Sequence, residues 1–153
     1  MSINRKAAAA FWLSTIALSM MGPKAIAPAS AADPLGTWYT EGNESQIRIS
    51  SCGDALCGTL MWLKEPNDPK TGKPKIDDEN FDAKKRTRPL LGIQIVLGLK
   101  PNGTPDQWKG EVYNAKDGNT YTGFFTITGP DTAELKGCAM GFICKSQNWT
   151  RVK

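Results

Sequence analysis

The stretch Gly36-Thr37-Trp38 opens the first strand-like segment of this sequence, and the chain closes on Trp149-Thr150-Arg151. A tryptophan near the start of a β-protein can fill one end of a barrel. An arginine in the last strand can then lie over the indole ring as a cation–π partner and hydrogen-bond the backbone beside it. We therefore expect Trp38 and Arg151 to meet. The alternative is that Trp38 is one core aromatic among several and that Arg151 is solvated.

The residues before this stretch have the pattern of a secretory signal peptide. A short basic start precedes an uncharged run from Ala7 to Met21, and Ala29-Ser30-Ala31 provides a small-x-small cleavage site. The apolar run has about 15 residues, which is short for a membrane-spanning helix. We predict a signal peptide over residues 1–31, cleaved after Ala31, and no integral membrane insertion. Residues 32–153 are then expected to form a single β-barrel domain.

The charge of the chain gives little reason to expect a nucleic-acid partner. The whole chain has a net charge of +4, but three of its 19 Lys and Arg residues and none of its 15 Asp and Glu residues lie in residues 1–31. The remainder therefore has 16 basic and 15 acidic residues and a net charge of +1. No basic stripe is left that would favour nucleic acid.

The four cysteines all follow the leader, which is typical of a protein that folds in an oxidising compartment. Cys52 and Cys57 bracket one turn, and Cys138 and Cys144 bracket another. Four cysteines allow three pairings, and we favour the two local disulfides, Cys52–Cys57 and Cys138–Cys144. A four-cysteine zinc site is the alternative, but the five-residue spacer of the second pair exceeds the usual spacing.

Short alternating segments between turn signals predict an all-β fold. In one of them, Ile47 and Ile49 are expected to face inward and Arg48 outward. Asp117-Gly118 predicts a type I′ hairpin turn. In another segment, one face is expected to carry Ile93, Ile95, Leu97 and Leu99, which alternate with Gly92, Gln94, Val96 and Gly98. The expected strands are residues 35–40, 45–51, 58–63, 91–99, 108–114, 120–128, 132–138 and 145–152.

Eight strands joined by short connections predict an antiparallel up-and-down barrel, with a β-sandwich as the alternative. Residues 64–90 are the exception, because this stretch is rich in charges and prolines and poor in apolar residues. One or two helical turns are expected over residues 82–86, with Asn80 or Asp82 as the N-cap. If the barrel holds a cavity, residues 64–90 form the only connection long enough to cover its mouth, as a mobile lid with few buried contacts.

The sequence contains no histidine, which excludes serine–histidine and cysteine–histidine nucleophile pairs. A carboxylate pair remains, drawn from Asp77, Asp78 and Glu79 together with Glu111. An acidic run in a loop is more often solvated, so we expect neither an enzyme nor a bound cofactor.

A calcium loop is the second alternative, because Asp78, Asn80 and Asp82 alternate as calcium ligands do. Its sixth position would be Ala83 where glycine is needed, and its twelfth would be Pro89 where glutamate is needed. No metal site is therefore expected.

Aromatic side chains on the central strands are the better candidates for a binding site, because small-ligand cavities are lined by apolar groups with a few polar tips. Arg86 and Arg88, at the end of the long connection, are candidates to hold a ligand carboxylate. The alternatives are a completely filled core and two solvated arginines. The candidate ligand-binding residues are Trp62, Arg86, Arg88, Tyr113, Tyr121 and Phe125, with Phe124 on the same strand.

Several blocks of the sequence resemble the DUF2147 family of bacterial secreted proteins. The family is similar to the lipocalin and fatty-acid-binding superfamily, whose barrels share a Gly-x-Trp first strand and a late arginine packed on the tryptophan; Gly36, Trp38 and Arg151 match. Family members often have Asn-Pro-Asp where this chain has Asn80-Phe81-Asp82. The matching blocks are residues 36–38, 52–58, 62–64, 88–92, 98–100, 108–110, 117–121 and 147–152.

This resemblance implies a lipocalin-like barrel and a periplasmic protein that binds a small amphipathic or hydrophobic molecule. The alternative function is a protein-interaction module of the cell envelope, such as an inhibitor or assembly factor, with a filled barrel. An empty interior would favour the first function, and a filled core with an apolar patch outside would favour the second.

Overall fold

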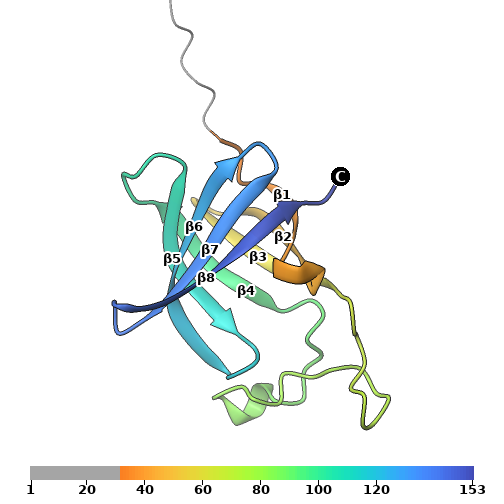
Figure 1. Ribbon diagram of the computed structural model, residues 1–153. Coiled ribbons are helices and arrows are strands. Elements are labelled where there is room, and N and C mark those ends of the chain that lie inside the picture. The colour runs from red at the N-terminus through yellow and green to blue at the C-terminus, as the bar shows by residue number, and fades with distance from the viewer. Residues whose placement is uncertain (1–31) are drawn as a thin grey trace, which may run out of the picture.

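Eight antiparallel strands close into a barrel in which each strand pairs with its neighbours in sequence and the first pairs with the last (Figure 1). The computed structural model describes residues 32–153, so the signal peptide predicted over residues 1–31 lies outside the described residues. The strands are β1 (Gly36–Tyr39), β2 (Ser45–Cys52), β3 (Ala55–Leu63), β4 (Gln94–Pro101), β5 (Gln107–Asn114), β6 (Asn119–Gly129), β7 (Thr132–Ala139) and β8 (Ile143–Arg151).

The predicted up-and-down barrel is confirmed, but two strands begin three residues away from their predicted starts, while the others begin within two residues of them. β3 begins three residues earlier than expected, because Gly53-Asp54 forms a two-residue turn that pairs Cys52 with Ala55. β4 begins three residues later, at Gln94. Gly92 has a φ of +91°, which belongs to a turn and not to a strand.

The inward face of β4 also differs from the simple alternation. Val96 and Leu99 are both fully buried although three residues separate them. Gly98 lies between them with a φ of +64°, and the pairing with β5 shifts between Leu97 and Lys100. This bulge rotates the strand, so Val96 and Leu99 point into the core while Leu97 does not.

One end of the barrel is closed by the first and last strands. The Arg151 guanidinium lies 4.1 Å from the centre of the Trp38 ring. It donates hydrogen bonds to the Leu35 carbonyl at 2.6 Å and to the Asp33 carbonyl at 2.7 Å. A side chain at Gly36 would approach the Arg151 Nη1 atom to 2.8 Å, so the glycine makes room for the arginine. Only two residue pairs join β1 to β8, and this contact reinforces that short seam.

The middle of the barrel is filled by side chains packed against glycines. A Cβ atom at Gly58 would lie 2.7 Å from the Val96 side chain and 2.9 Å from that of Ile49. At Gly123 it would lie 2.5 Å from Val112. These approaches are closer than real carbon contacts, so this layer leaves no space for even one more methyl group.

An aromatic cluster continues the core toward the closed end. Phe125 is fully buried and makes edge-on or tilted contacts with the rings of Trp38, Trp108 and Trp149, at centroid distances of 5.6 to 6.5 Å. Ile47 and Ile49 are buried and Arg48 is exposed, as the alternation of β2 predicts.

The β5–β6 turn is longer than the predicted type I′ turn. Asn114 pairs with Asn119, which leaves four residues in the loop, and only Gly118 has a positive φ, of +70°. The Gly118 amide donates to the Asn114 carbonyl at 2.9 Å, and the Asn114 side chain accepts from Lys116 N. A four-residue loop of this kind needs a left-handed residue only at its end, and Gly118 meets that need.

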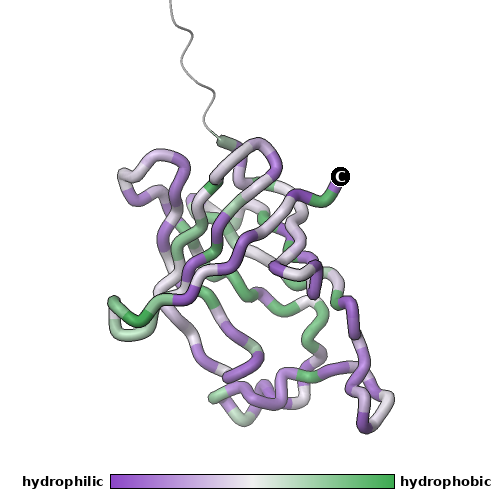
Figure 2. Tube along the Cα trace, in the orientation of Figure 1, coloured by the Kyte–Doolittle hydropathy of each residue, from purple (hydrophilic) through white to green (hydrophobic). Residues whose placement is uncertain are grey.

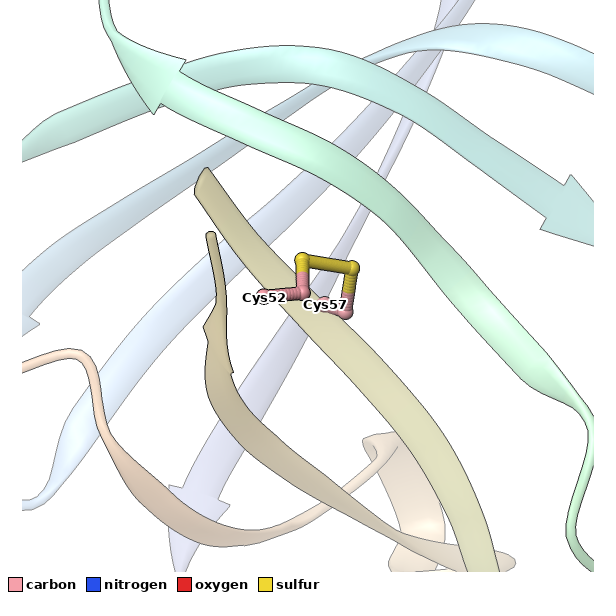
Figure 3. Close-up of a disulfide and its surroundings, with 2 residues drawn as sticks. All are labelled: Cys52 and Cys57. Atoms are coloured by element: carbon pink, nitrogen blue, oxygen red, sulfur yellow. A yellow bond between two sulfur atoms is a disulfide. The ribbon is translucent and has the colours of Figure 1, made fainter. Parts of the chain in front are cut away.

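Both disulfides connect adjacent strands. Cys52 at the end of β2 is bonded to Cys57 in β3, close to the intervening turn (Figure 3). Cys138 and Cys144 lie directly opposite each other in β7 and β8, with their Cα atoms 4.0 Å apart. The two local pairings are those that the sequence favoured.

The connection between β3 and β4 has little regular structure. It contains one 3₁₀ turn, η2 (Ala83–Lys85), whose N-cap Asp82 accepts a hydrogen bond from Lys84 N. The other 3₁₀ turn, η1 (Glu41–Asn43), joins β1 to β2. Among residues 32–153, no helix has the length and apolar character needed to cross a membrane.

Candidate functional site

The connection from Lys64 to Ile93, called here the β3–β4 segment, is fastened to the barrel by a buried carboxylate. The Asp77 side chain is completely buried. One of its oxygens accepts a hydrogen bond from the Tyr113 hydroxyl at 2.5 Å. The other accepts from Asn80 Nδ2 at 2.7 Å and from Arg88 Nε at 2.9 Å. Both oxygens of the carboxylate are therefore used to hold parts of the segment against β5.

Arg88 completes this arrangement with its charge. Its Nη2 atom lies 2.8 Å from the Asp77 carboxylate, so two guanidinium nitrogens contact the same oxygen. The guanidinium carbon lies 5.9 Å from the centre of the Tyr113 ring. A buried carboxylate is stable only with such charged and hydrogen-bonding partners. Arg88 is thus largely committed to the structure of the site.

Asn80 links the carboxylate to the rest of the segment. Its Nδ2 atom also donates to the Tyr113 hydroxyl at 2.9 Å, and its Oδ1 atom accepts from Asp82 N at 2.8 Å. Its backbone carbonyl accepts from Arg86 Nε at 2.7 Å. One asparagine therefore sets both the approach to the barrel and the start of the 3₁₀ turn.

The electrostatics of this cluster keep Tyr113 protonated. Burial, together with the hydrogen bond and the negative charge of Asp77, raises the pKa of Tyr113 to about 12. The Asn80 hydrogen bond and the Arg88 charge act in the opposite direction on the same pKa. Tyr113 is consequently a neutral hydrogen-bond donor at physiological pH and not a general base.

A pocket of about 930 Å³ lies beside this cluster, between the β3–β4 segment, the start of β4 and the β5–β6 hairpin. In Figure 1 these parts frame the lower end of the barrel. Tyr113 and Leu97 line the pocket, and each follows a buried, inward-facing valine in its strand. Since neighbouring residues of a strand face opposite sides, the pocket lies against the outer face of the sheet and not on the barrel axis.

The lining of the pocket is amphipathic. Its apolar side chains include Phe81, which is 87% exposed, and Leu91, which is 45% exposed. Its cations are Lys85 and Arg88. The Lys85 ammonium lies 3.7 Å from the Asp82 carboxylate, and more than half of its side chain is exposed. Lys85 is therefore the more available of the two cations for a bound anion.

The structure brings three of the predicted ligand-binding residues together. Arg88 and Tyr113 line the pocket, and Arg86 contacts it through Asn80. Tyr121 does not line this pocket, and its hydroxyl donates to Asp117 at 2.8 Å. Trp62 is partly exposed on β3, where it packs edge-on against Tyr39. Phe125 is part of the core described above.

Two properties of the β3–β4 segment differ from expectation. The acidic run was expected to be solvated, but Asp77 is fully buried while Asp78 and Glu79 are exposed. The segment was also expected to have few buried contacts. In the described part of the chain, the buried polar residues Asp77 and Asn80 both belong to it. The reason is Tyr113, whose hydroxyl gives these polar groups a partner on the barrel.

Sequence reasoning missed Asp77, Asn80 and Lys85 as members of this site. A usable signal was present for Asn80, which precedes a short capped turn. Nothing in the local sequence separates Asp77 from Asp78, because the difference in their burial depends on a contact with Tyr113, 36 residues away.

Of the predicted carboxylate set, Glu111 lies in β5 opposite Thr122 of β6. Among residues 32–153, no three potential metal ligands cluster together.

These features define a lipocalin-like β-barrel protein with an amphipathic pocket at one end. A family described as "Uncharacterized protein conserved in bacteria (DUF2147)" matches residues 36–151, and the chain belongs to this family. No curated protein matches the chain. Among solved structures, the chain is similar to protein HP1028 from Helicobacter pylori, which is described as belonging to the lipocalin family. The identity is 21% and the TM-score 0.65, over 80% of this chain and 84% of that one, so this similarity concerns the fold.

Proposed function

We propose that this protein is a periplasmic lipocalin-like binding protein for a small amphipathic molecule that carries an acidic group. The observation that carries the proposal is the 930 Å³ pocket, which combines an apolar wall with the cations Lys85 and Arg88. This volume falls within the range of about 300–1,000 Å³ that is usual for small-molecule sites.

The arrangement of the lining supports an acid with an apolar tail. Phe81, Leu91 and Leu97 offer apolar surface whose burial would favour binding. Lys85 offers an ammonium whose present partner, Asp82, lies at 3.7 Å on the surface, and such exposed pairs are weak. An anionic head group can therefore compete with the Asp82 carboxylate for the Lys85 ammonium.

The pocket offers a direct test, because none of its lining residues is a tryptophan. Phe81→Trp would place a fluorescent reporter at an exposed position of the lining. The variant would be titrated with straight-chain fatty acids and with the alcohols of the same chain lengths. We expect saturable binding of the acids. Lys85→Gln in the same background should weaken acid binding several-fold and leave alcohol binding unchanged.

Lys84→Gln is the matched control, because Lys84 adjoins Lys85 but does not line the pocket. An equal effect of Lys84→Gln and Lys85→Gln would contradict a specific anchor. Failure of every apolar compound to give a saturable signal would overturn the proposed function. Mass spectrometry of the protein purified gently from its host would identify a co-purifying ligand independently.

The proposed location is supported by the two disulfides, which form in oxidising compartments. It is supported also by the leader pattern of residues 1–31. The intact mass of the protein recovered from the periplasm should correspond to a chain that begins at Ala32. A mass that still includes residues 1–31 would contradict cleavage after Ala31.

The alternative function, a protein-interaction module of the envelope, is favoured by the filled middle of the barrel. The close packing of Gly58 and Gly123 against Val96 and Val112 leaves no central ligand cavity at that level. The fluorescence titration separates the two functions, because an interaction module would bind none of the small amphiphiles.

A further inference from the structure

The tip of the β7–β8 hairpin is an apolar projection that the rest of the described chain does not cover. Met140 is 84% exposed, Phe142 75% and Ile143 55%. Figure 2 shows this tip as a hydrophobic end that extends beyond the barrel wall. Large apolar side chains gathered at one exposed site mark a surface with a binding role. The tip takes no part in the pocket described above.

The tip is held in one shape by covalent and backbone constraints. The Cys138–Cys144 disulfide closes the hairpin directly below it, and Ala139 pairs with Ile143. Met140 and Gly141 form the turn with φ values of +51° and +80°, and the Phe142 amide donates to the Ala139 carbonyl at 3.2 Å. A preformed tip avoids much of the entropy loss that ordering a flexible loop would cost on binding.

Cations lie behind the apolar tip. Lys136 and Lys145 lie on the two strands of the hairpin, and residues 135–153 include no Asp or Glu. The Lys136 and Lys109 ammonium groups lie 5.4 and 5.5 Å from the centre of the Phe124 ring, on one face of the sheet. Within residues 32–153, none of these three lysines forms an ion pair.

Two acidic residues are close enough to weaken this positive region. Glu134 precedes Lys136 by two residues on the same face of β7. Glu111 shares a row of the sheet with Thr122 and Cys138, two strands away from β7. The three lysines, none of which forms an ion pair among the described residues, still outnumber these two carboxylates. The region around the tip is therefore positively charged overall.

From this arrangement we infer that the β7–β8 tip inserts into the surface of an anionic lipid bilayer. Lys136 lies four residues along the hairpin from Met140 and Lys145 three residues from Phe142, a distance of about 10 Å in an extended strand. That is the depth at which the apolar face of an interfacial element lies beneath the lipid head groups. Met140, Phe142 and Ile143 would then contact acyl chains, while the lysines contact the negatively charged head groups.

The shape of the tip favours a bilayer over a folded protein partner. A stable protein interface buries about 800 Å² on each partner, which needs a broad surface, whereas this projection exposes three large side chains on a narrow hairpin. The β7–β8 tip and the β5–β6 hairpin are at the same end of the up-and-down barrel, so a docked bilayer would also face the pocket. The inference stands on the tip alone and does not require that the pocket bind a lipid.

The test is co-sedimentation of the purified, disulfide-intact protein with two kinds of vesicle. One is a mixture of phosphatidylglycerol and phosphatidylethanolamine, and the other is pure phosphatidylcholine. We expect binding to the first that weakens as salt is raised, because the lysine contribution is screened. Met140→Ser with Phe142→Ser should lower the partition coefficient at least tenfold, since the apolar contacts are lost.

Lys136→Gln with Lys145→Gln should lower partitioning severalfold on the anionic vesicles only. Met61→Ser is the matched control, because Met61 is an exposed apolar residue of β3, which lies across the barrel ring from β7. The outcomes that overturn the inference are absence of vesicle binding and equal losses in the control and tip variants. A concentration-dependent dimer or a protein complex that the tip variants abolish, without vesicle binding, would overturn it too.

Discussion

At the scale of single residues, the contact between Trp38 and Arg151 joins the two ends of the folded chain. Truncation of a large buried aromatic costs roughly 3–5 kcal/mol, and we expect this loss of unfolding free energy for Trp38→Ala. Arg151→Ala should cost less. Because the guanidinium lies 4.1 Å from the ring centre, the two effects should not add. Urea denaturation of both single variants and the double variant measures the coupling, and strictly additive costs would contradict the contact.

Tyr113 provides a prediction on pH. Burial, assisted by Asp77, raises the pKa of Tyr113 to about 12, compared with a value of 10.0 for a free tyrosine. The unfolded chain therefore releases this proton at lower pH than the folded protein does. Stability from this group is complete below pH 10 and is lost as the pH rises from 10 to about 12.

The measurement is the unfolding free energy of the protein and of Tyr113→Phe between pH 9 and pH 12. The parent should lose stability more steeply than the variant over this range. Parallel curves of unfolding free energy against pH for the two proteins would show that Tyr113 has the same pKa in the folded and unfolded chains. The raised pKa of Tyr121, whose hydroxyl contacts Asp117, is common to both proteins and cancels in the comparison.

At the scale of elements, the β3–β4 segment rests directly on the β5–β6 turn. A Cβ atom at Gly118 would collide with the Glu79 carbonyl, and Gly118 has a φ of +70°. We expect Gly118→Ala to loosen the segment while the barrel stays folded. Limited trypsin digestion should then cleave the segment, which is rich in lysine, much faster than in the parent.

Gly103→Ala is the control for this experiment. Gly103 also has a positive φ, of +88°, but a Cβ atom there would meet nothing within 4 Å. Gly103→Ala therefore introduces the same kind of backbone strain as Gly118→Ala, but without a collision with the Glu79 carbonyl. Equal protease sensitivity in the two variants would show that strain alone, and not contact with the segment, accounts for the effect.

The elements also show what the sequence can predict and where local patterns fail. Strand existence was predictable because alternation, as at Ile47 and Ile49, and turn residues are local signals. The register of β4 was not predictable, because the bulge at Gly98 moves Val96 and Leu99 onto one face without changing the composition of the strand. The residues of the candidate site were harder to predict than the strand register. Asp77 is buried because Tyr113 and Arg88 converge on it, and a single sequence without structural context does not show such a convergence.

At the scale of the whole molecule, the barrel has a solid middle layer that a glycine substitution can probe. Gly123→Ala should lower the unfolding free energy by about 1–3 kcal/mol, which is usual for overpacking a core. Gly137 lies opposite Gly123 on the same inner face, and a Cβ there would lie 3.4 Å from Val112, an ordinary contact distance. Gly137→Ala should therefore be tolerated. Equal tolerance of both substitutions in denaturant titrations would indicate a spacious interior.

The seam between β1 and β8 determines when the chain can finish folding. Its two residue pairs and the Arg151 hydrogen bonds connect the beginning of the barrel to its last residues. A growing chain therefore cannot close the ring until β8 has been synthesised, and contacts so distant in sequence form slowly. For a chain exported to the periplasm, as proposed, this delay favours a polypeptide that is still unfolded during translocation. A protein truncated before β8 would leave the outer edges of β1 and β7 unpaired and prone to aggregate.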